Sequence, residues 1–288
     1  MIKRFGFMLV VNFLIMIVIS LILSILNIRP NGTIMGLLVF CLMFGMGGSF
    51  ISLWLSKWLA KRGMGLIEVD PHSSHAYLIT RVHEFAKRSN IQPPEVYIYE
   101  SDELNAFATG PSKNNSLVAV STGLLHSLSR DEVEGVLGHE VAHIANGDMV
   151  SMTLIQGVVN AFVMFLARIV AYAIDTALSS DDDEGGGLGY IGYFIVLNVL
   201  HAFFGFITMP VVAWFSRYRE YRADEGGALL AGKEKMISAL EALERRFDVT
   251  MLDQSEPSLK AMKISGGGVS ELFSTHPPLS KRIKALQK

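Results

Sequence analysis

Charged side chains are scarce in this chain of 288 residues. Lys, Arg, Asp and Glu together make up 18% of it, whereas soluble domains average about 25%. Half of the residues are hydrophobic, and the mean hydropathy is +0.37. A chain with so few charges and so many apolar residues is typical of a membrane protein.

Cysteine and net charge are also nearly absent. The single cysteine, Cys41, excludes an intramolecular disulfide and any metal cluster built from several thiolates. The formal net charge is −2 and the isoelectric point is near 6.4. Because nucleic-acid-binding domains are usually strongly basic, nucleic acid is not an expected partner. Nothing in the composition predicts an oligomeric state.

Long runs without charge predict transmembrane helices, because each is long enough to cross a bilayer core of about 30 Å. The first run follows Lys3 and Arg4, as in a signal peptide, but it exceeds the usual apolar length of about 7–15 residues and is read as a retained anchor. The four predicted spans are residues 5–28, 33–56, 149–174 and 188–212.

The spans divide the chain into four predicted parts. A first transmembrane hairpin covers residues 1–62, and a second covers 149–215 with a loop at 175–187. Residues 63–148 and 216–288 carry helical periodicity and short β-rich runs, which predict a soluble α+β domain. Lys and Arg gather beside this domain and at the N-terminus. The positive-inside rule therefore predicts a multi-pass protein with both termini and the soluble domain in the cytosol.

The stretch "VLGHEVAHIANGD" lies in a predicted helix of the soluble domain. Ser129 and Glu132 form the S-x-x-E pattern of a capping box, which marks the start of the helix. Asn146 and Gly147 are typical of a helix end. The motif HEVAH therefore falls in the second half of a helix of about four turns.

Two histidines of this helix are candidate metal ligands. His139 and His143 are four residues apart, so both rings project from one face, and Glu140 stands beside them as a candidate base. Two histidines one turn apart also occur in ordinary helices, so a zinc site needs a third ligand. The extension that supplies a third histidine in one protease class is absent, because Asn146 and Met149 occupy its positions.

The stretch "SRYREYRADEGGA", after the fourth run, offers a carboxylate ligand. Glu220 and Asp224 are four residues apart on a predicted helix that returns to the side of HEVAH after two crossings. Glu220 would complete the zinc site, and Asp224 would accept a hydrogen bond from a ligand imidazole. The alternative is a juxtamembrane helix in which Arg217, Arg219 and Arg222 pair with these carboxylates.

These motifs together resemble the HtpX-type membrane zinc endopeptidases of bacteria and, more distantly, the CAAX prenyl proteases. The resemblance implies that His139, His143 and Glu220 bind one Zn²⁺. It also implies that Glu140 is catalytic and that Asp224 orients a ligand. The segments that carry it are "GHEVAHIANGD", "REYRADEGGA", "NAFATG", "VAVSTGLL" and "STHPPLSKRI".

Two further site residues follow from the resemblance alone. His276, in "STHPPLSKRI", would stabilise the oxyanion, although a histidine before two prolines can simply fix a turn. Asn105, in "NAFATG", would hold the substrate backbone, although it can also cap the start of a strand. "SLVAVST" resembles the edge strand on which such proteases lay an extended peptide, but it could equally be buried sheet core.

The predicted fold is thus an α-helical integral membrane protein with four transmembrane helices and a cytosolic α+β zincin-like domain. The predicted function is a zinc endopeptidase that cleaves membrane or misfolded proteins at the cytosolic face of a bacterial inner membrane, in quality control and stress response. Two alternatives are a non-proteolytic scaffold with the same fold and a small transporter. The complete set of candidate ligands argues against the scaffold, and the large soluble part argues against the transporter.

Overall fold

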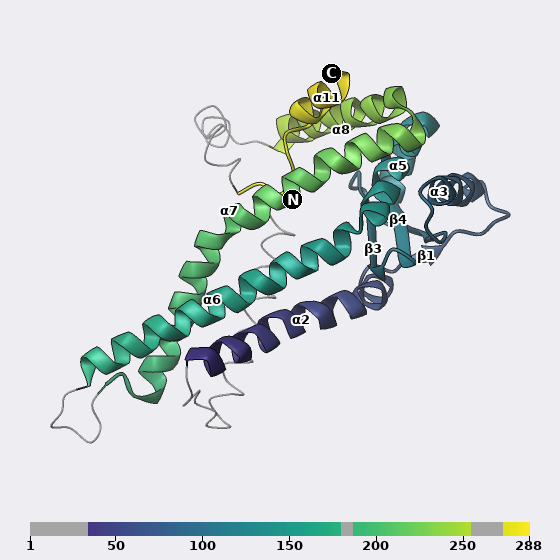
Figure 1. The fold of residues 1–288 in the computed structure, drawn as a ribbon. Coiled ribbons are helices and arrows are strands. Elements are labelled where there is room, and N and C mark those ends of the chain that lie inside the picture. Colours follow the sequence, from purple (N-terminus) through teal and green to yellow (C-terminus); the bar gives the residue numbers. More distant parts are fainter. Residues whose placement is uncertain (1–33, 180–186, 255–272) are drawn as a thin grey trace. The chain divides into compact units, whose positions relative to one another are not determined.

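The computed structural model describes residues 34–179, 187–254 and 273–288 (Figure 1). The helices are α2 (Ile34–Gly63), α3 (Ala76–Arg88), α4 (Thr122–Ser127), α5 (Arg130–Asn146), α6 (Asp148–Leu178), α7 (Gly189–Ala231), α8 (Lys233–Gln254) and α11 (Leu279–Gln287). The strands are β1 (Ile67–Glu68), β2 (Glu95–Tyr99), β3 (Ala106–Ser112) and β4 (Asn115–Ser121).

The chain divides into two compact units, and three helices contribute to both. One unit comprises Met1–Ser49 and Ile155–Met209, and the other comprises Phe50–Leu154 and Pro210–Lys288. The borders fall inside α2, α6 and α7, so no linker separates the two units at these points.

Three helices of the described chain, α2, α6 and α7, are long and apolar enough to cross a membrane. They account for three of the four predicted spans, and the predicted span at 5–28 lies outside the described residues. The prediction of a loop from residue 175 was wrong, because α6 continues to Leu178. The predicted continuation of a helix beyond the fourth span is confirmed, because the 43 residues of α7 run without a break past residue 212 to Ala231.

Within the first unit, small residues let two membrane helices approach closely. A Cβ atom placed on Gly45 of α2 would lie 2.5 Å from the backbone nitrogen of Ala161 on α6. One placed on Gly157 of α6 would lie 3.2 Å from the Cα atom of Met46. Helices in lipid associate through such backbone contacts, because lipid tails compete with large apolar side chains.

The second unit contains one mixed sheet with the strand order β1-β2-β4-β3. β2 and β4 run parallel, and β3 and β4 run antiparallel, with Phe107 opposite Ala119. The β-rich runs of the sequence are thus strands, and of the two roles left open for "SLVAVST" the structure shows buried sheet core. β4, which contains "SLVAVS", lies between two neighbours and is buried from Ser116 onward, and the edge strand is β3.

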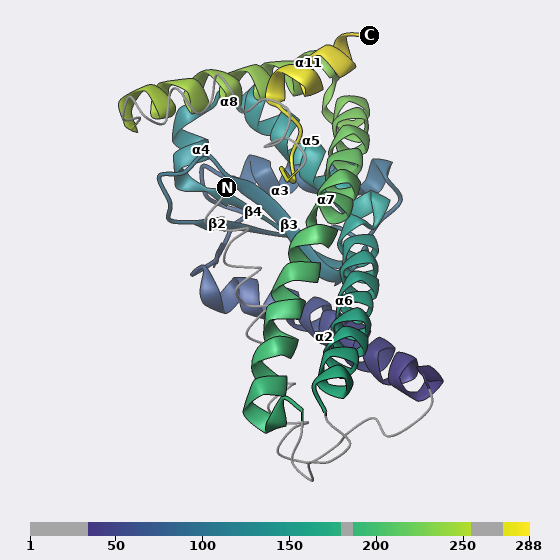
Figure 2. The ribbon, with the colours of Figure 1, turned by 90° about the vertical axis from the view of Figure 1, so that its left-hand side faces the viewer.

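Helix α5 is central to the second unit. It contacts α3, α8 and the strands β3 and β4 (Figure 2). Its two ends match the prediction. Ser129 and Glu132 form both hydrogen bonds of a capping box, and Gly147 ends the helix with φ 70°, a left-handed conformation that glycine adopts without strain. α11 packs against α8, and both helices follow α7 along the chain.

Candidate metal centre

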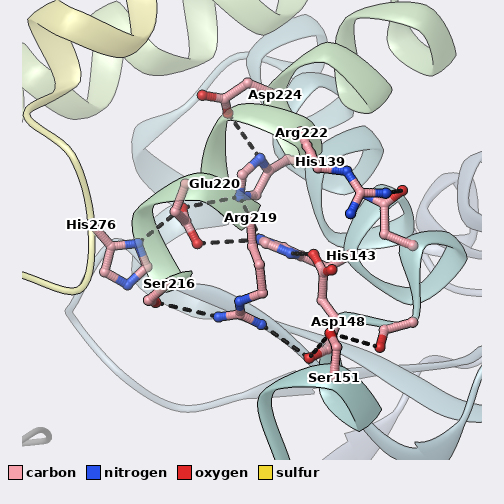
Figure 3. Close-up of polar contacts among 12 residues, drawn as sticks. His139, His143, Asp148, Ser151, Ser216, Arg219, Glu220, Arg222, Asp224 and His276 are labelled. Atoms are coloured by element: carbon pink, nitrogen blue, oxygen red, sulfur yellow. Dashed lines mark hydrogen bonds and ion pairs between the residues drawn. The ribbon is translucent and has the colours of Figure 1, made fainter. Parts of the chain in front are cut away.

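Three ligand-type side chains converge where α5 faces α7 (Figure 3). His139 and His143 project from α5, and Glu220 projects from α7. One potential ligand atom from each residue lies within 4.8 Å of the other two. Within the described ranges, this is the one cluster of three or more His, Cys, Asp or Glu side chains with metal-ligand spacing.

The separations between these atoms suit a tetrahedral zinc ion. The Nε2 atoms of His139 and His143 are 3.1 Å apart. The Glu220 carboxylate oxygens lie 3.6 Å from the His139 Nε2 and 3.4 Å from the His143 Nε2. Zinc–ligand bonds of about 2.0–2.1 Å at tetrahedral angles place neighbouring ligand atoms about 3.3–3.4 Å apart. The donor set of two imidazoles and one carboxylate, which leaves a position open, is typical of catalytic zinc.

The other ring nitrogen of each histidine contacts a buried aspartate. The Nδ1 of His139 lies 3.0 Å from Asp224, and the Nδ1 of His143 lies 2.7 Å from Asp148. When each Nδ1 carries a proton and donates it to the carboxylate, both Nε2 lone pairs point at the metal position. Asp224 thus contacts a ligand imidazole, and its orienting role stays a prediction. Asp148 was missed by the sequence analysis.

Glycines explain how α7 comes so close to α5. A Cβ atom on Gly227 would lie 2.9 Å from the backbone nitrogen of His139, and one on Gly226 would lie 2.7 Å from the Cβ of Ala142. From the opposite side, a Cβ atom on Gly138 would lie 3.0 Å from the carbonyl oxygen of Gly227. The glycines in "GHEVAH" and "DEGGA" therefore let the two backbones approach each other and bring Glu220 to the histidines.

Carboxylates around the imidazoles also control their protonation. Burial lowers the pKa of His143, but hydrogen bonds with Asp148 and Glu220 outweigh it and raise the pKa to about 9. Burial also lowers the pKa of His139, but hydrogen bonds with Asp224 and Glu220 outweigh it and raise that pKa. The 3.1 Å between the two Nε2 atoms leaves room for one proton, so the two rings cannot both carry a proton at Nε2.

The three remaining predicted site residues lie in different surroundings. His276 is half-exposed, and its Nδ1 lies 2.9 Å from the Glu220 carboxylate (Figure 3). Glu140 is partly exposed on α5, within electrostatic range of His143. The side-chain amide of Asn105 donates to the hydroxyl of Tyr99. No hydrogen bond or ion pair in the described chain joins Asn105 to the three ligands.

One buried arginine near the ligands was missed by the sequence analysis. Arg282 of α11 donates two hydrogen bonds to Asp224, and one of its nitrogens lies 3.3 Å from the Oε2 of Glu220. That Oε2 atom is buried, and although the Nδ1 of His276 lies 2.9 Å away, no described donor is well aligned with it, which fits a metal ligand. No spacing along the sequence links Arg282 to HEVAH, because the contact depends on how the C-terminal helix packs.

A comparison with protein families identifies the chain. The model described as peptidase family M48 matches residues 72–288, a range that includes all three ligands. The chain belongs to peptidase family M48. As an M48 member it is a zinc metalloprotease, with zinc bound by His139, His143 and Glu220, and its substrates are polypeptides. The protease hypothesis is therefore confirmed over the scaffold and the transporter.

Similar proteins within M48 cover the whole chain. Protease HtpX of Shewanella oneidensis strain MR-1 is 52% identical over 288 residues, which is 99% of both chains. Protease HtpX of Shewanella sp. strain ANA-3 is equally similar. The crystal structure of S. mikatae Ste24p matches with a TM-score of 0.67 at 19% identity. That match covers all of this chain and 65% of Ste24p, and it shows a shared fold. The predicted resemblance is thus confirmed.

Proposed function

We propose that this M48 metalloprotease cleaves membrane or misfolded polypeptides at the cytosolic face of a bacterial inner membrane, as part of membrane-protein quality control under stress. The observation that carries the proposal is the direct connection of the metal ligands to helices long and apolar enough to cross a membrane. The ligand helix α5 leads through Gly147 directly into α6, and the ligand Glu220 follows the apolar part of α7. Metal ligands attached so closely to membrane helices favour substrates that lie at the bilayer surface.

The membrane face follows from the distribution of basic residues. Lys57, Lys61 and Arg62 end α2, and "SRYREYR" follows the apolar part of α7. The loop between α6 and α7 carries four acidic residues and no Lys or Arg. Since basic residues favour the cytosolic side, we assign the soluble parts, 63–148 and 216–288, and both termini to the cytosol.

We assign the chemical steps to three residues. When bound, zinc lowers the pKa of water and polarises the scissile carbonyl. Glu140 accepts the proton of the attacking water and passes it to the leaving amine. His276, held by its Nδ1 contact with Glu220, donates to the developing oxyanion through its other nitrogen. Asp224 keeps His139 in the ligand tautomer by accepting the proton of its Nδ1.

Substrate binding is assigned to the edge of the sheet. Among the described strands β3 has one partner, β4, so we assign its second edge to pairing with an extended peptide. Asn105 precedes β3, and its backbone amide donates to the hydroxyl of Ser121. Because its side chain contacts Tyr99, Asn105 would act on the substrate backbone only after leaving this hydrogen bond. An Asn105→Asp change should therefore raise KM more than it lowers kcat.

The proposal is tested in proteoliposomes of known protein orientation. The reporters are two polypeptides that each cross the membrane once. One carries a cleavable unstructured segment on one side of the membrane, and the other carries it on the opposite side. We expect cleavage of the segment on the side of Lys57 and Arg62, its loss on chelation, and its return with added zinc. Cleavage confined to the opposite side would overturn the assignment of the membrane face at which the protease cleaves. Cleavage of soluble unfolded casein alone would overturn the substrate class.

A further inference from the structure

Each ligand imidazole is the first member of a chain of contacts that ends at an arginine. Asp224 and Asp148 lie behind His139 and His143, and their exposed fractions are only 1% and 2%. A buried aspartate can orient a ring only if its own position is fixed, because a carboxylate that rotates carries the imidazole with it. What holds the two aspartates therefore determines how well the ligands point at the metal.

Arg282 holds Asp224 through a bidentate hydrogen-bonded contact. The Nε of Arg282 donates to Oδ2 at 2.8 Å, and its Nη2 donates to Oδ1 at 2.6 Å. The same Oδ1 lies 3.0 Å from the Nδ1 of His139. Since both nitrogens share this one acceptor, they come within 3.5 Å of each other. Arg282 is 7% exposed, so its planar fork fixes the plane of the carboxylate in a dry environment.

Asp148 is held by Arg219 at the backbone. The Nη1 of Arg219 donates to the carbonyl oxygen of Asp148 at 3.2 Å, and its Nη2 lies 3.4 Å from the Ser216 hydroxyl (Figure 3). Asp148 is the first residue of α6 and follows Gly147, where the chain changes direction. Arg219 directly precedes the ligand Glu220. The same turn of α7 therefore supplies one ligand and fixes the residue that orients another.

We propose that Arg219 and Arg282 are positioning residues of the zinc site, each acting through its aspartate on one ligand imidazole. Neither needs to touch substrate for this role. Arg282 comes from α11, so the metal site is complete only when the C-terminal helix is packed in place. The proposal rests on the orienting role assigned to Asp224, and it adds a matching role for Asp148.

Zinc affinity of the full-length protein in detergent measures this effect directly. After the metal is removed, zinc is returned in competition with a chromophoric chelator. Changes to groups that orient metal ligands weaken affinity by about 10–100-fold. We expect such a loss for Arg282→Gln and for Arg219→Gln. Arg282→Lys should recover part of the zinc affinity, because lysine keeps the positive charge but cannot form the bidentate hydrogen bonds of the guanidinium. At saturating zinc, KM for a polypeptide should match wild type.

Arg222→Gln is the matched control. Arg222 lies on the same helix, one turn from Arg219, but it is exposed and contacts Asn146 at 3.4 Å rather than an aspartate behind a ligand. We expect wild-type zinc affinity. An affinity loss equal to that of Arg219→Gln would show a general effect of charge on α7 and would overturn the proposal for Arg219.

Double-mutant cycles separate the two chains of contacts. If Arg282 acts through Asp224, then Arg282→Gln should weaken zinc binding little further in an Asp224→Asn background. Arg219→Gln should likewise weaken zinc binding little further in an Asp148→Asn background. The losses of zinc affinity should add when the arginine change is combined with the other aspartate change, as in Arg282→Gln with Asp148→Asn. If the losses of zinc affinity add for an arginine and the aspartate that it contacts, the proposal is overturned and the role of the aspartates is left intact. If Asp224→Asn itself kept wild-type affinity, the assigned role of Asp224 would fail as well.

Discussion

The Nε2 atoms of His139 and His143 face each other at 3.1 Å while their Nδ1 atoms contact Asp224 and Asp148. Two N–H groups cannot point at each other at this distance, so at least one Nε2 offers a lone pair. The arrangement is suited to a cation between the rings, and we expect a proton to compete with zinc for that place. This competition gives the first prediction.

Zinc binding should release a proton at neutral pH. His143 has a pKa near 9 in the folded, metal-free protein, above the unperturbed 6.5. Zinc needs the neutral ring, so its apparent affinity should rise about tenfold per pH unit up to about pH 9. The metal-free fold gains stability from this proton below about pH 6.5 and loses it as the pH rises through about 9. Calorimetry in buffers of different ionisation enthalpy measures the release, and no proton released at about pH 7.5 would contradict the assignment.

Gly227→Ala should disturb the contact between α5 and α7. The new Cβ atom would lie 2.9 Å from the His139 backbone and 3.0 Å from the sulfur of Met236. We expect a destabilisation of about 1–3 kcal/mol and weaker zinc binding, because the helices must separate. Gly205→Ala is the control, since it lies on the same helix with no atom within 4 Å of the new Cβ. Thermal unfolding should distinguish the two, and equal melting temperatures would refute the close-packing role.

Glu95 should stabilise the second unit above acidic pH. Burial alone raises its pKa, but hydrogen bonds from Lys57, Lys61 and Tyr97 outweigh this and lower the pKa to about 2. The folded pKa lies below the unfolded value of 4.5, so the contribution is present above about pH 4.5 and is lost as the pH falls towards 2.

The measurement for Glu95 is the melting temperature of Glu95→Gln against pH. It should lie below that of wild type at neutral pH, and the difference should narrow below about pH 4.5. Glu84→Gln is the control, because its ion pair with Arg81 is solvent-exposed and such pairs contribute about 0–1 kcal/mol. A difference between Glu95→Gln and wild type that does not change with pH would contradict the assignment.

His276→Ala should impair catalysis rather than zinc binding. Loss of a donor to the oxyanion typically lowers kcat by about 10²–10³-fold. His276 contacts Glu220 from the exposed side, whereas the two imidazole ligands contact it from α5. Zinc content and KM should therefore stay near wild type. A fall in zinc content that matches the loss of kcat would instead assign His276 a structural role at Glu220.

Local signals in the sequence predicted much of the fold and most of the site. Capping by Ser129 and the end at Gly147 depend on neighbouring residues, so α5 could be placed from the sequence. His139, His143 and Glu220 were predicted because i,i+4 spacing and the hairpin order are visible along the chain. For β4 the sequence left an edge strand and buried sheet core open, and its run is apolar on both faces, which is typical of the interior strand that the structure shows.

The rest of the site depends on tertiary packing. Asp148 follows the helix stop, and only the turn at Gly147 directs its carboxylate back to His143. Arg282 reaches Asp224 from a helix 58 residues later along the chain. Strand order and the arginine contacts are long-range properties, so no periodicity in the sequence reports them.

The assignment of Glu140 as the base is the central claim, and one experiment tests it most directly. Wild type and Glu140→Gln are purified in detergent, zinc is counted per chain, and cleavage of an unfolded polypeptide is measured on the same samples. We predict one zinc per chain in both proteins and at least about a 10²-fold loss of cleavage in the variant. Wild-type cleavage by Glu140→Gln, with its zinc in place, would contradict the account.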